Sequence, residues 1–236
     1  MWTKKKIRVR LSFMKALTIP FFFLFSFCAI PQNCACAVLT VKELQDKMEE
    51  SSRSIESAQF KFIQEMKSSL SDEIKESSGT VIFKKPKFLK IEQRSPEHQI
   101  IVTSGKTVFI YTPRFNQVIK KDWNEWMEAN FFFPGITQIS GSLEKLKKDY
   151  DWSLENHSNA LFKKEVRVRL KNKESKEGTE MLLTLDEKET ILKKMEFFLN
   201  TFKVTTTLQE FEKNPNLKEK DFEFKPPKDA AVFQMD

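Results

Sequence analysis

Cysteine and histidine are scarce in this chain, which narrows the chemistry that it can perform. The three cysteines, Cys28, Cys34 and Cys36, lie near the N-terminus, and no cysteine follows them. The two histidines, His98 and His157, lie in polar turns without a serine or carboxylate at a spacing typical of catalysis. The motifs GxSxG, HExxH, GxGxxG and the phosphate-binding P-loop are also missing. We therefore expect no enzyme, no metal site and no cofactor.

The first 37 residues have the pattern of a cleavable secretory signal. Residues 1–15 contain six Lys and Arg and no acid, residues 16–30 are an apolar run, and an A-x-A site ends at Ala37. A basic segment, an apolar run and a small-residue site direct export, after which the signal is removed. We predict cleavage after Ala37. A retained anchor is the disfavoured alternative, because the run is shorter than the roughly 20 residues that span a bilayer.

Removal of this signal leaves a chain with balanced charge. The whole sequence has 40 Lys and Arg against 33 Asp and Glu, and without the six cations of the signal 34 remain against 33. We expect no nucleic-acid partner, because nucleic-acid binding needs a basic patch on the folded domain. Every cysteine also leaves, which excludes disulfides, cysteine-bound zinc and a cysteine nucleophile. Residues 38–236 are enough for one domain stabilised by its core alone.

One helix and many short strands are predicted in this domain. Thr40 and Glu43 form a capping-box pattern at the start of a helix over 40–54. The polar tract 68–78 indicates a hairpin turn or a mobile loop. Alternating apolar residues and turn signals predict strands at 58–66, 79–85, 87–94, 99–103, 107–112, 117–121, 150–155, 161–170, 179–185, 192–199, 202–211 and 221–224.

These elements predict a mainly β (α+β) fold. A sheet that contains about ten or eleven of these strands in antiparallel order must curl, because neighbouring strands twist relative to each other. One face of such a sheet can be solvated while helices cover the other face. We expect a single curled antiparallel sheet, with one helix before it and a helical insertion near its middle.

The insertion, between residues 122 and 150, is predicted to contain two or three short helices. Asp122 and Glu125 form a capping signal, and a Pro-Gly pair at 134–135 divides the segment. Large apolar side chains crowd the part between residues 123 and 139. A plain core is one interpretation of this cluster. The other is a lid, held by breakable contacts over an apolar cavity.

Several motifs of the chain are shared with a known family. They are GxxxxKKP at 79–86, PxxxIIVxxGKxVFxYxP at 96–113, DFEFKPP at 221–227 and FxQ at 62–64. With these motifs the chain resembles LolA, the family of periplasmic outer-membrane lipoprotein carriers. The resemblance implies an unclosed half-barrel whose concave face is covered by a lid of short helices over an apolar cavity.

The resemblance also implies a function and partners. The cargo is an acylated lipoprotein, which a monomeric carrier takes from an inner-membrane ABC transporter and delivers to an outer-membrane acceptor similar to LolB. No cofactor takes part. The chain lacks the lipidation cysteine that LolB carries. A periplasmic binder of another lipid on the same fold is the first alternative, and a secreted hydrolase with an unrecognised site is the second.

Site residues follow from the same resemblance. Family members have an arginine before the strand-end proline that holds the lid closed, and Lys85 occupies that position here. We expect a weaker latch, because lysine is a mobile point charge whereas arginine is a planar fork of donors. An ordinary solvated lysine is the alternative. The cargo cavity is predicted to be lined by Phe62, Val81, Phe83, Leu89, Ile91, Trp126, Phe132, Phe133, Ile136 and Ile139.

Overall fold

The computed structural model describes residues 39–129, 142–155, 165–174, 180–199 and 201–235. The chain divides into Met1–Ala37 and a second unit, Val38–Asp236, to which every described residue belongs. The predicted signal and its cleavage after Ala37 lie outside the described residues and stay predictions.

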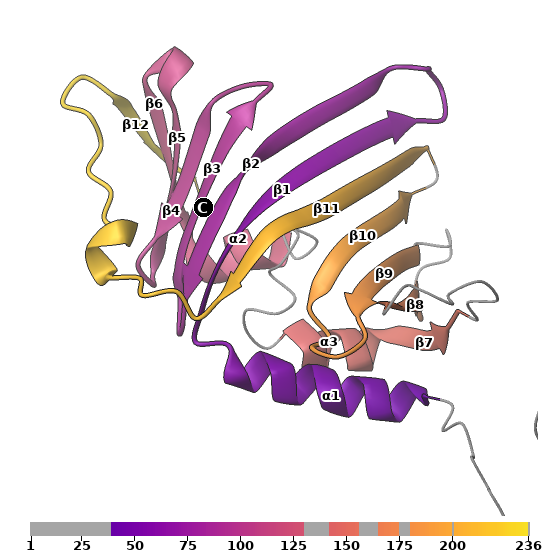
Figure 1. The fold of residues 1–236 in the computed structure, drawn as a ribbon. Coiled ribbons are helices and arrows are strands. Elements are labelled where there is room, and N and C mark those ends of the chain that lie inside the picture. The colour runs from indigo at the N-terminus through magenta and orange to yellow at the C-terminus, as the bar shows by residue number, and fades with distance from the viewer. Residues whose placement is uncertain (1–38, 130–141, 156–164, 175–179, 200, 236) are drawn as a thin grey trace, which may run out of the picture. The chain divides into compact units, whose positions relative to one another are not determined.

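One twelve-stranded sheet forms the framework of the second unit (Figure 1). Its strands are β1 (Ser57–Ser68), β2 (Ile74–Lys84), β3 (Phe88–Ser95), β4 (Gln99–Thr103), β5 (Thr107–Thr112), β6 (Gln117–Asp122), β7 (Tyr150–Leu154), β8 (Glu165–Asn172), β9 (Glu180–Asp186), β10 (Leu192–Leu199), β11 (Phe202–Lys213) and β12 (Ala231–Gln234). The strand order is β12-β6-β5-β4-β3-β2-β1-β11-β10-β9-β8-β7. All neighbours are antiparallel except β12 and β6, and β1 joins the two halves by pairing with β11. The predicted fold class, a curled antiparallel sheet that is not closed, is confirmed.

Three α-helices accompany the sheet in the described part of the chain: α1 (Val41–Ser54), α2 (Trp123–Ala129) and α3 (Ser142–Asp149). Helix α1 begins with the predicted capping box, in which the Glu43 amide donates to Thr40 Oγ1 at 3.2 Å and the Thr40 amide donates to Glu43 Oε2 at 2.8 Å. The Thr40 amide also holds the pKa of Glu43 below its ordinary value. Buried Leu44 and Met48 fix the side of α1 that faces the core.

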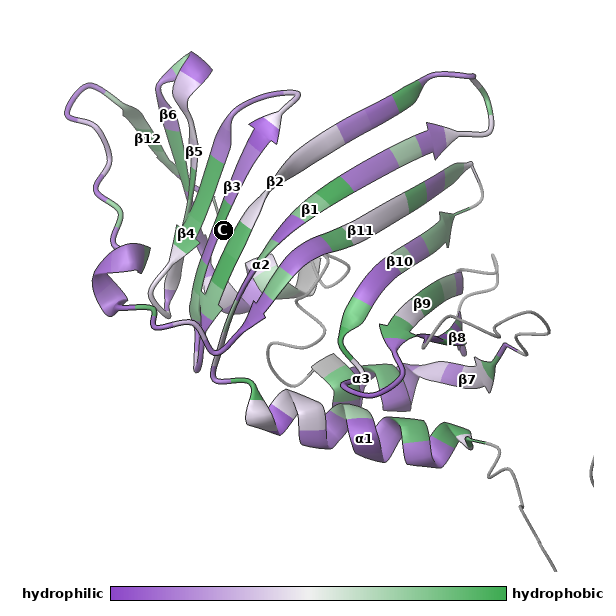
Figure 2. Ribbon diagram, viewed as in Figure 1, coloured by the Kyte–Doolittle hydropathy of each residue, from purple (hydrophilic) through white to green (hydrophobic). Residues whose placement is uncertain are grey.

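The two faces of the sheet follow from alternation along the strands. In β2 and β3 the residues Val81, Phe83, Leu89 and Ile91 are buried, and the residues between them are partly exposed. Hydrophobic and hydrophilic residues alternate in the same way along several strands in Figure 2. The apolar face is the concave face, against which α2 and α3 pack, whereas the convex face is the outer face.

The predicted hairpin turn lies within the polar tract 68–78, but the prediction was wrong in its extent, because strand residues occupy about half of the tract. β1 extends to Ser68 and β2 begins at Ile74, which leaves only residues 69–73 for the turn. Most residues of this hairpin end are exposed on both faces. Polar residues are compatible with strand structure where both faces of the strand are exposed, because the hydrogen bonds between strands are made by the backbone.

The tract 221–224 is not a strand, so that prediction was also wrong. The 3₁₀ helix η3 (Glu219–Phe222) occupies its first part, and the last strand of the chain is β12. Asp221 closes the turn, because its amide donates to the Lys218 carbonyl at 3.0 Å and its carboxylate accepts from the Lys218 amide at 2.7 Å. Phe222 is buried by this turn and packs on Phe88, with ring centroids 5.5 Å apart.

Candidate functional site

The concave face of β1, β2 and β3 is the centre of the candidate site. The five sheet residues predicted for the cavity, Phe62, Val81, Phe83, Leu89 and Ile91, are each at most 2% exposed and belong to one apolar cluster. Cross-strand pairing places Val81 beside Ile91 and Phe83 beside Leu89. The structure therefore brings the five residues together. Their role in holding cargo stays a prediction.

Gly79 provides the space in which Phe62 packs. It lies at an irregularity in the pairing of β2 with β3. A Cβ atom at this position would be 2.9 Å from Phe62 Cε1 and 2.3 Å from the carbonyl oxygen of Glu92. Both distances are shorter than van der Waals contact, so only glycine allows this approach of ring and backbone.

Helices α2 and α3 place a second set of large side chains against this cluster. Trp123 and Trp126, one turn apart on α2, are buried and stack with ring centroids 6.0 Å apart. Leu143 and Leu146 are buried in the same way on α3. Trp152 of β7 donates its Nε1 hydrogen to the Leu146 carbonyl at 3.1 Å. Short helices anchored by a few large side chains thus cover part of the apolar face.

The predicted lid residues are only partly within the described structure. Trp126 lies in the buried cluster, as the five sheet residues do. The other four lie within residues 130–141, outside the described residues, and their role stays a prediction: Phe132, Phe133, Ile136 and Ile139.

Four residues of the same cluster that lie on or next to α2 and α3 were not named among the predicted cavity residues. They are Trp123, Leu143, Leu146 and Tyr150. The spacing of three between Trp123 and Trp126, and again between Leu143 and Leu146, is the helical period that could have identified three of them. Tyr150 follows α3 directly and begins β7, so its position depends on where the helix ends.

Lys85 binds the end of helix α1. Its ammonium group donates to the carbonyl oxygens of Ser52 at 3.1 Å and Arg53 at 3.3 Å, and lies 3.6 Å from Glu56 Oε1. The last carbonyls of a helix lack partners within it and carry partial negative charge, so a lysine there is favourable. Within the described residues Lys85 therefore connects the sheet to α1. Its role as a latch stays a prediction, because residues 130–141 lie outside them.

The interior of the site carries almost no charge. Glu196 is the one buried charged residue in the described ranges, and it lies on the outer face, in an ion-pair network. Burial raises the pKa of Tyr150, and a hydrogen bond with Asn172 opposes this effect only in part, so Tyr150 is neutral at physiological pH. The residues that the structure describes contain no cluster of His, Cys, Asp and Glu able to hold a metal. None of the described helices has the length and apolar character needed to cross a membrane.

Comparison with known proteins identifies the family. The model of the family "Outer membrane lipoprotein carrier protein LolA" matches residues 53–225, which is most of the chain. The chain belongs to the LolA family. This membership supports a lipoprotein-binding or carrier role in general. No curated protein matches the chain.

Solved structures resemble the LolA-type fold described above at low sequence identity. An uncharacterised conserved protein from Thermus thermophilus has a TM-score of 0.54 and 16% identity, over 82% of this chain and 98% of that one. A LolA superfamily protein from Nitrosomonas europaea has a TM-score of 0.42 and 12% identity, over 79% of this chain and 99% of that one. A putative outer membrane lipoprotein-sorting protein domain from Vibrio parahaemolyticus has a TM-score of 0.39 and 10% identity, over 75% of this chain and 95% of that one. At these identities only the fold is compared.

Proposed function

We propose that this protein carries acylated lipoproteins through the periplasm, from an inner-membrane ABC transporter to an outer-membrane acceptor. The supporting observation is the buried apolar cluster between the concave face of the sheet and helices α2 and α3, in a chain of the LolA family. The protein acts as a monomer by binding and release, without catalysis and without a cofactor.

The energetics of acyl chains explain why such a carrier needs a donor that uses ATP. Burial of a chain is worth about 0.8 kcal/mol per CH₂ group, so a long chain gains on the order of ten kcal/mol on leaving water. A bilayer offers a similar gain, so affinity alone does not extract the cargo. The transporter supplies the extraction energy, and the carrier needs only to keep the acyl chains out of water until release.

Helices α2 and α3 are suited to exchange places with cargo. Each is short, and in the described structure each contacts the sheet through a pair of large residues: Trp123 with Trp126, and Leu143 with Leu146. When acyl chains enter, they replace the contacts of these side chains with Phe62 and its neighbours. Loading therefore exchanges one set of apolar contacts for another, which keeps binding reversible.

Photo-crosslinking in the native cell tests the location of the cargo. A photoreactive phenylalanine analogue replaces Trp126, which is 3% exposed, and in a matched variant it replaces Phe115, which is 60% exposed. We expect crosslinks to triacylated lipoprotein at position 126 and none at position 115. Equal crosslinking at both positions, or crosslinks to free lipid alone at position 126, would contradict the proposal. The second of these results would support a binder of another lipid.

Depletion of the protein in its native cell tests the direction of transport. We expect outer-membrane lipoproteins to accumulate in the inner membrane as the carrier is lost. Normal sorting after complete depletion would refute the carrier function.

The latch is tested by two substitutions at one position. Lys85→Leu removes the charge and the hydrogen bonds to the end of α1, whereas Lys85→Arg restores the planar group of the family. We expect Lys85→Leu to change the rate of cargo release to acceptor membranes, and Lys85→Arg to hold cargo at least as long as the native protein. Unchanged release by Lys85→Leu would leave Lys85 as a cap of α1 only.

A further inference from the structure

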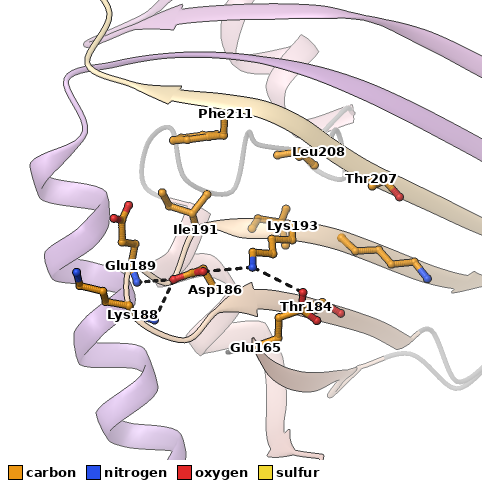
Figure 3. A pocket seen from close by; sticks show the side chains of 12 residues that line it. Glu165, Thr184, Asp186, Lys188, Glu189, Ile191, Lys193, Thr207, Leu208 and Phe211 are labelled. Carbon is orange, nitrogen blue, oxygen red and sulfur yellow. Dashed lines mark hydrogen bonds and ion pairs between the residues drawn. The ribbon is translucent and has the colours of Figure 1, made fainter. Parts of the chain in front are cut away.

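A pocket of about 780 Å³ opens in the wall of the sheet between β10 and β11 (Figure 3). Its apolar lining comes from Ile191, Leu192, Leu208 and Phe211. Leu192 and Leu208 belong to the buried core, and Phe211 packs against it. The volume lies within the range of about 300–1,000 Å³ that is usual for small-molecule sites. None of the four was predicted to line the cargo cavity, although cross-strand pairing places Leu208 beside Phe62 of that cavity.

The opening exists because two neighbouring strands separate. β10 and β11 pair from Leu199 with Phe202 only as far as Lys194 with Thr207, although β11 continues to Lys213 beside β1. The pairing of β10 with β9 is irregular between Leu192 and Lys194, and that of β11 with β1 is irregular close by. Bulges bend strands and end pairing. The separation therefore gives the outer face access to apolar side chains of the core.

The lower rim of the pocket is a rigid turn attached to helix α1. The Asp186 carboxylate accepts the amide hydrogens of Lys188 and Glu189, both at 3.0 Å. Ser51 of α1 donates its hydroxyl hydrogen to the Glu189 carbonyl at 2.7 Å. The pocket is thus formed before any ligand arrives, which lowers the cost of binding.

The charges around the pocket are not all neutralised. Lys193 lies 3.2 Å from Asp186 and 3.6 Å from Glu165, so it is paired. A second hollow of about 370 Å³ adjoins the first, because Lys188 and Glu189 line both. Lys47, Lys188 and Lys213 line this second hollow and form no ion pair with any other described residue.

Acidic residues reduce but do not cancel this positive charge. Glu50 and Glu189 line the same hollow as the three lysines, so cations exceed acids there by one. Ser51 and Ser54 of α1 also line this hollow, but their hydroxyl hydrogens are donated to the carbonyl oxygens of Glu189 and Ser51. A hollow with an excess of one ammonium group can bind a carboxylate or a phosphate.

We propose that these adjoining hollows form a second binding site, for an amphiphile with an acyl chain and an anionic head group. The acyl chain lies on Ile191, Leu208 and Phe211, and the head group faces Lys188 and Lys213. The site opens on the outer face of the sheet, whereas the proposed cargo site lies on the concave face. A free fatty acid and an anionic phospholipid share this chemistry.

The test is calorimetric titration of the purified, delipidated exported protein with soluble amphiphiles of one chain length. The probes are laurate, lysophosphatidylglycerol with a lauroyl chain, and dodecyltrimethylammonium. We expect one or both anionic probes to bind more tightly than the cation. Tighter binding of laurate identifies the ligand as a free fatty acid, and tighter binding of lysophosphatidylglycerol identifies it as an anionic phospholipid. Equal binding of the cation and both anions would overturn the proposal.

Two variants locate the site. Ile191→Trp fills the apolar pocket and should weaken laurate binding about tenfold, the equivalent of about 1.4 kcal/mol. Lys188→Ala with Lys213→Ala should weaken laurate binding about fivefold per lysine, at about 1 kcal/mol per charge, and should not weaken binding of the cation.

Matched controls are Val232→Trp, at a residue that is 45% exposed on β12, and Lys228→Ala, at another exposed lysine. Neither should change binding. If Ile191→Trp does not fold, the lysine variant decides. Laurate binding that resists both pocket variants but is lost in Trp126→Ala would place the ligand in the interior, and the second site would be refuted.

Discussion

The two halves of the sheet differ in the side chains that cover their outer face. Over β3 and β5, aromatic side chains of the C-terminal segment cover the strands. Phe222 packs on Phe88 at 5.5 Å between ring centroids, and Phe224 packs on Phe109 at 5.6 Å and on Tyr111 at 5.8 Å. This half therefore has a thin second apolar layer on its outer side.

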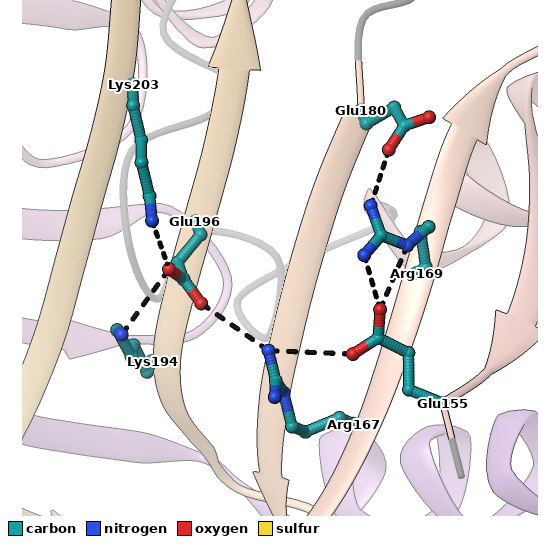
Figure 4. A network of polar contacts seen from close by, with 7 residues as sticks. All are labelled: Glu155, Arg167, Arg169, Glu180, Lys194, Glu196 and Lys203. Atoms are coloured by element: carbon teal, nitrogen blue, oxygen red, sulfur yellow. Dashed lines mark hydrogen bonds and ion pairs between the residues drawn. The ribbon is translucent and has the colours of Figure 1, made fainter.

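Over β8–β11, charged side chains take the place of that layer (Figure 4). Arg169 donates from Nη1 to Glu180 at 2.6 Å and from Nε to Glu155 at 3.0 Å. Lys203 lies 2.7 Å from the buried carboxylate of Glu196. The remaining members of this network are Arg167 and Lys194.

The difference shows that one sheet can be protected by burial or by charge. Burial of an aromatic ring contributes several kcal/mol and is insensitive to salt and pH. An ion pair on a surface contributes about 0–1 kcal/mol and depends on ionic strength and on ionisation. We therefore expect the two halves to respond differently to substitution, to salt and to pH.

The largest effect is expected for Phe222→Ala. Phe222 is 1% exposed, so its removal leaves a cavity over β3 and should lower the free energy of unfolding by about 3–5 kcal/mol. Urea-induced unfolding measures the change. Phe115→Ala is the matched control, because Phe115 is 60% exposed and its loss should cost less than about 0.5 kcal/mol. Similar losses in the two variants would show that the C-terminal segment does not stabilise the sheet.

A smaller effect is expected for Glu196→Gln in the charged half. Its partners Lys194 and Lys203 are partly exposed and can turn to water, so the loss should be about 1–2 kcal/mol. Glu210→Gln is the control, because the Lys61–Glu210 pair is exposed on both sides and its loss should be near zero. High salt should shrink the Glu196 effect and leave the Phe222 effect unchanged. An effect of Glu196→Gln that is independent of salt would contradict an electrostatic origin.

The smallest effect is a dependence on pH at Glu180. Hydrogen bonds from Arg169 and Lys171 hold the pKa of Glu180 below its ordinary value. Because the folded-state pKa is lowered, the stabilisation is present above the unfolded pKa of about 4.3 and is lost as pH falls through the folded value. The free energy of unfolding of the native protein should therefore exceed that of Glu180→Gln by up to about 1 kcal/mol at neutral pH. Below both the folded and the unfolded pKa of Glu180 the two free energies should not differ through this ion pair.

Unfolding of both proteins at neutral pH and in strong acid measures this difference. The loss of unfolding free energy caused by Phe222→Ala should be the same at neutral pH and in strong acid. If the native protein and Glu180→Gln differ in unfolding free energy by the same amount at neutral pH and in strong acid, the ion pair does not contribute through its charge.

Much of the fold was predictable because it rests on local patterns. The capping box of Thr40 and Glu43 started α1 at the expected residue. Alternation in β2 and β3 identified the buried side of the sheet, which placed Val81 and Leu89 in one cluster. Local patterns failed for tract 221–224, where the apolar alternation is typical of a strand but the backbone forms a turn. The partner of Phe222, a ring on β3, lies far away in sequence.

The sequence by itself determined the exclusion of cysteine chemistry from residues 38–236, the concave face of the central strands and the family motifs, because each depends on residue type at short spacing. The tertiary structure decided which strands meet. It paired β1 with β11, put Lys85 at the end of α1, laid the C-terminal aromatics on the outer face and separated β10 from β11. These features depend on contacts between residues far apart in the chain, and no local pattern specifies which distant partner is chosen.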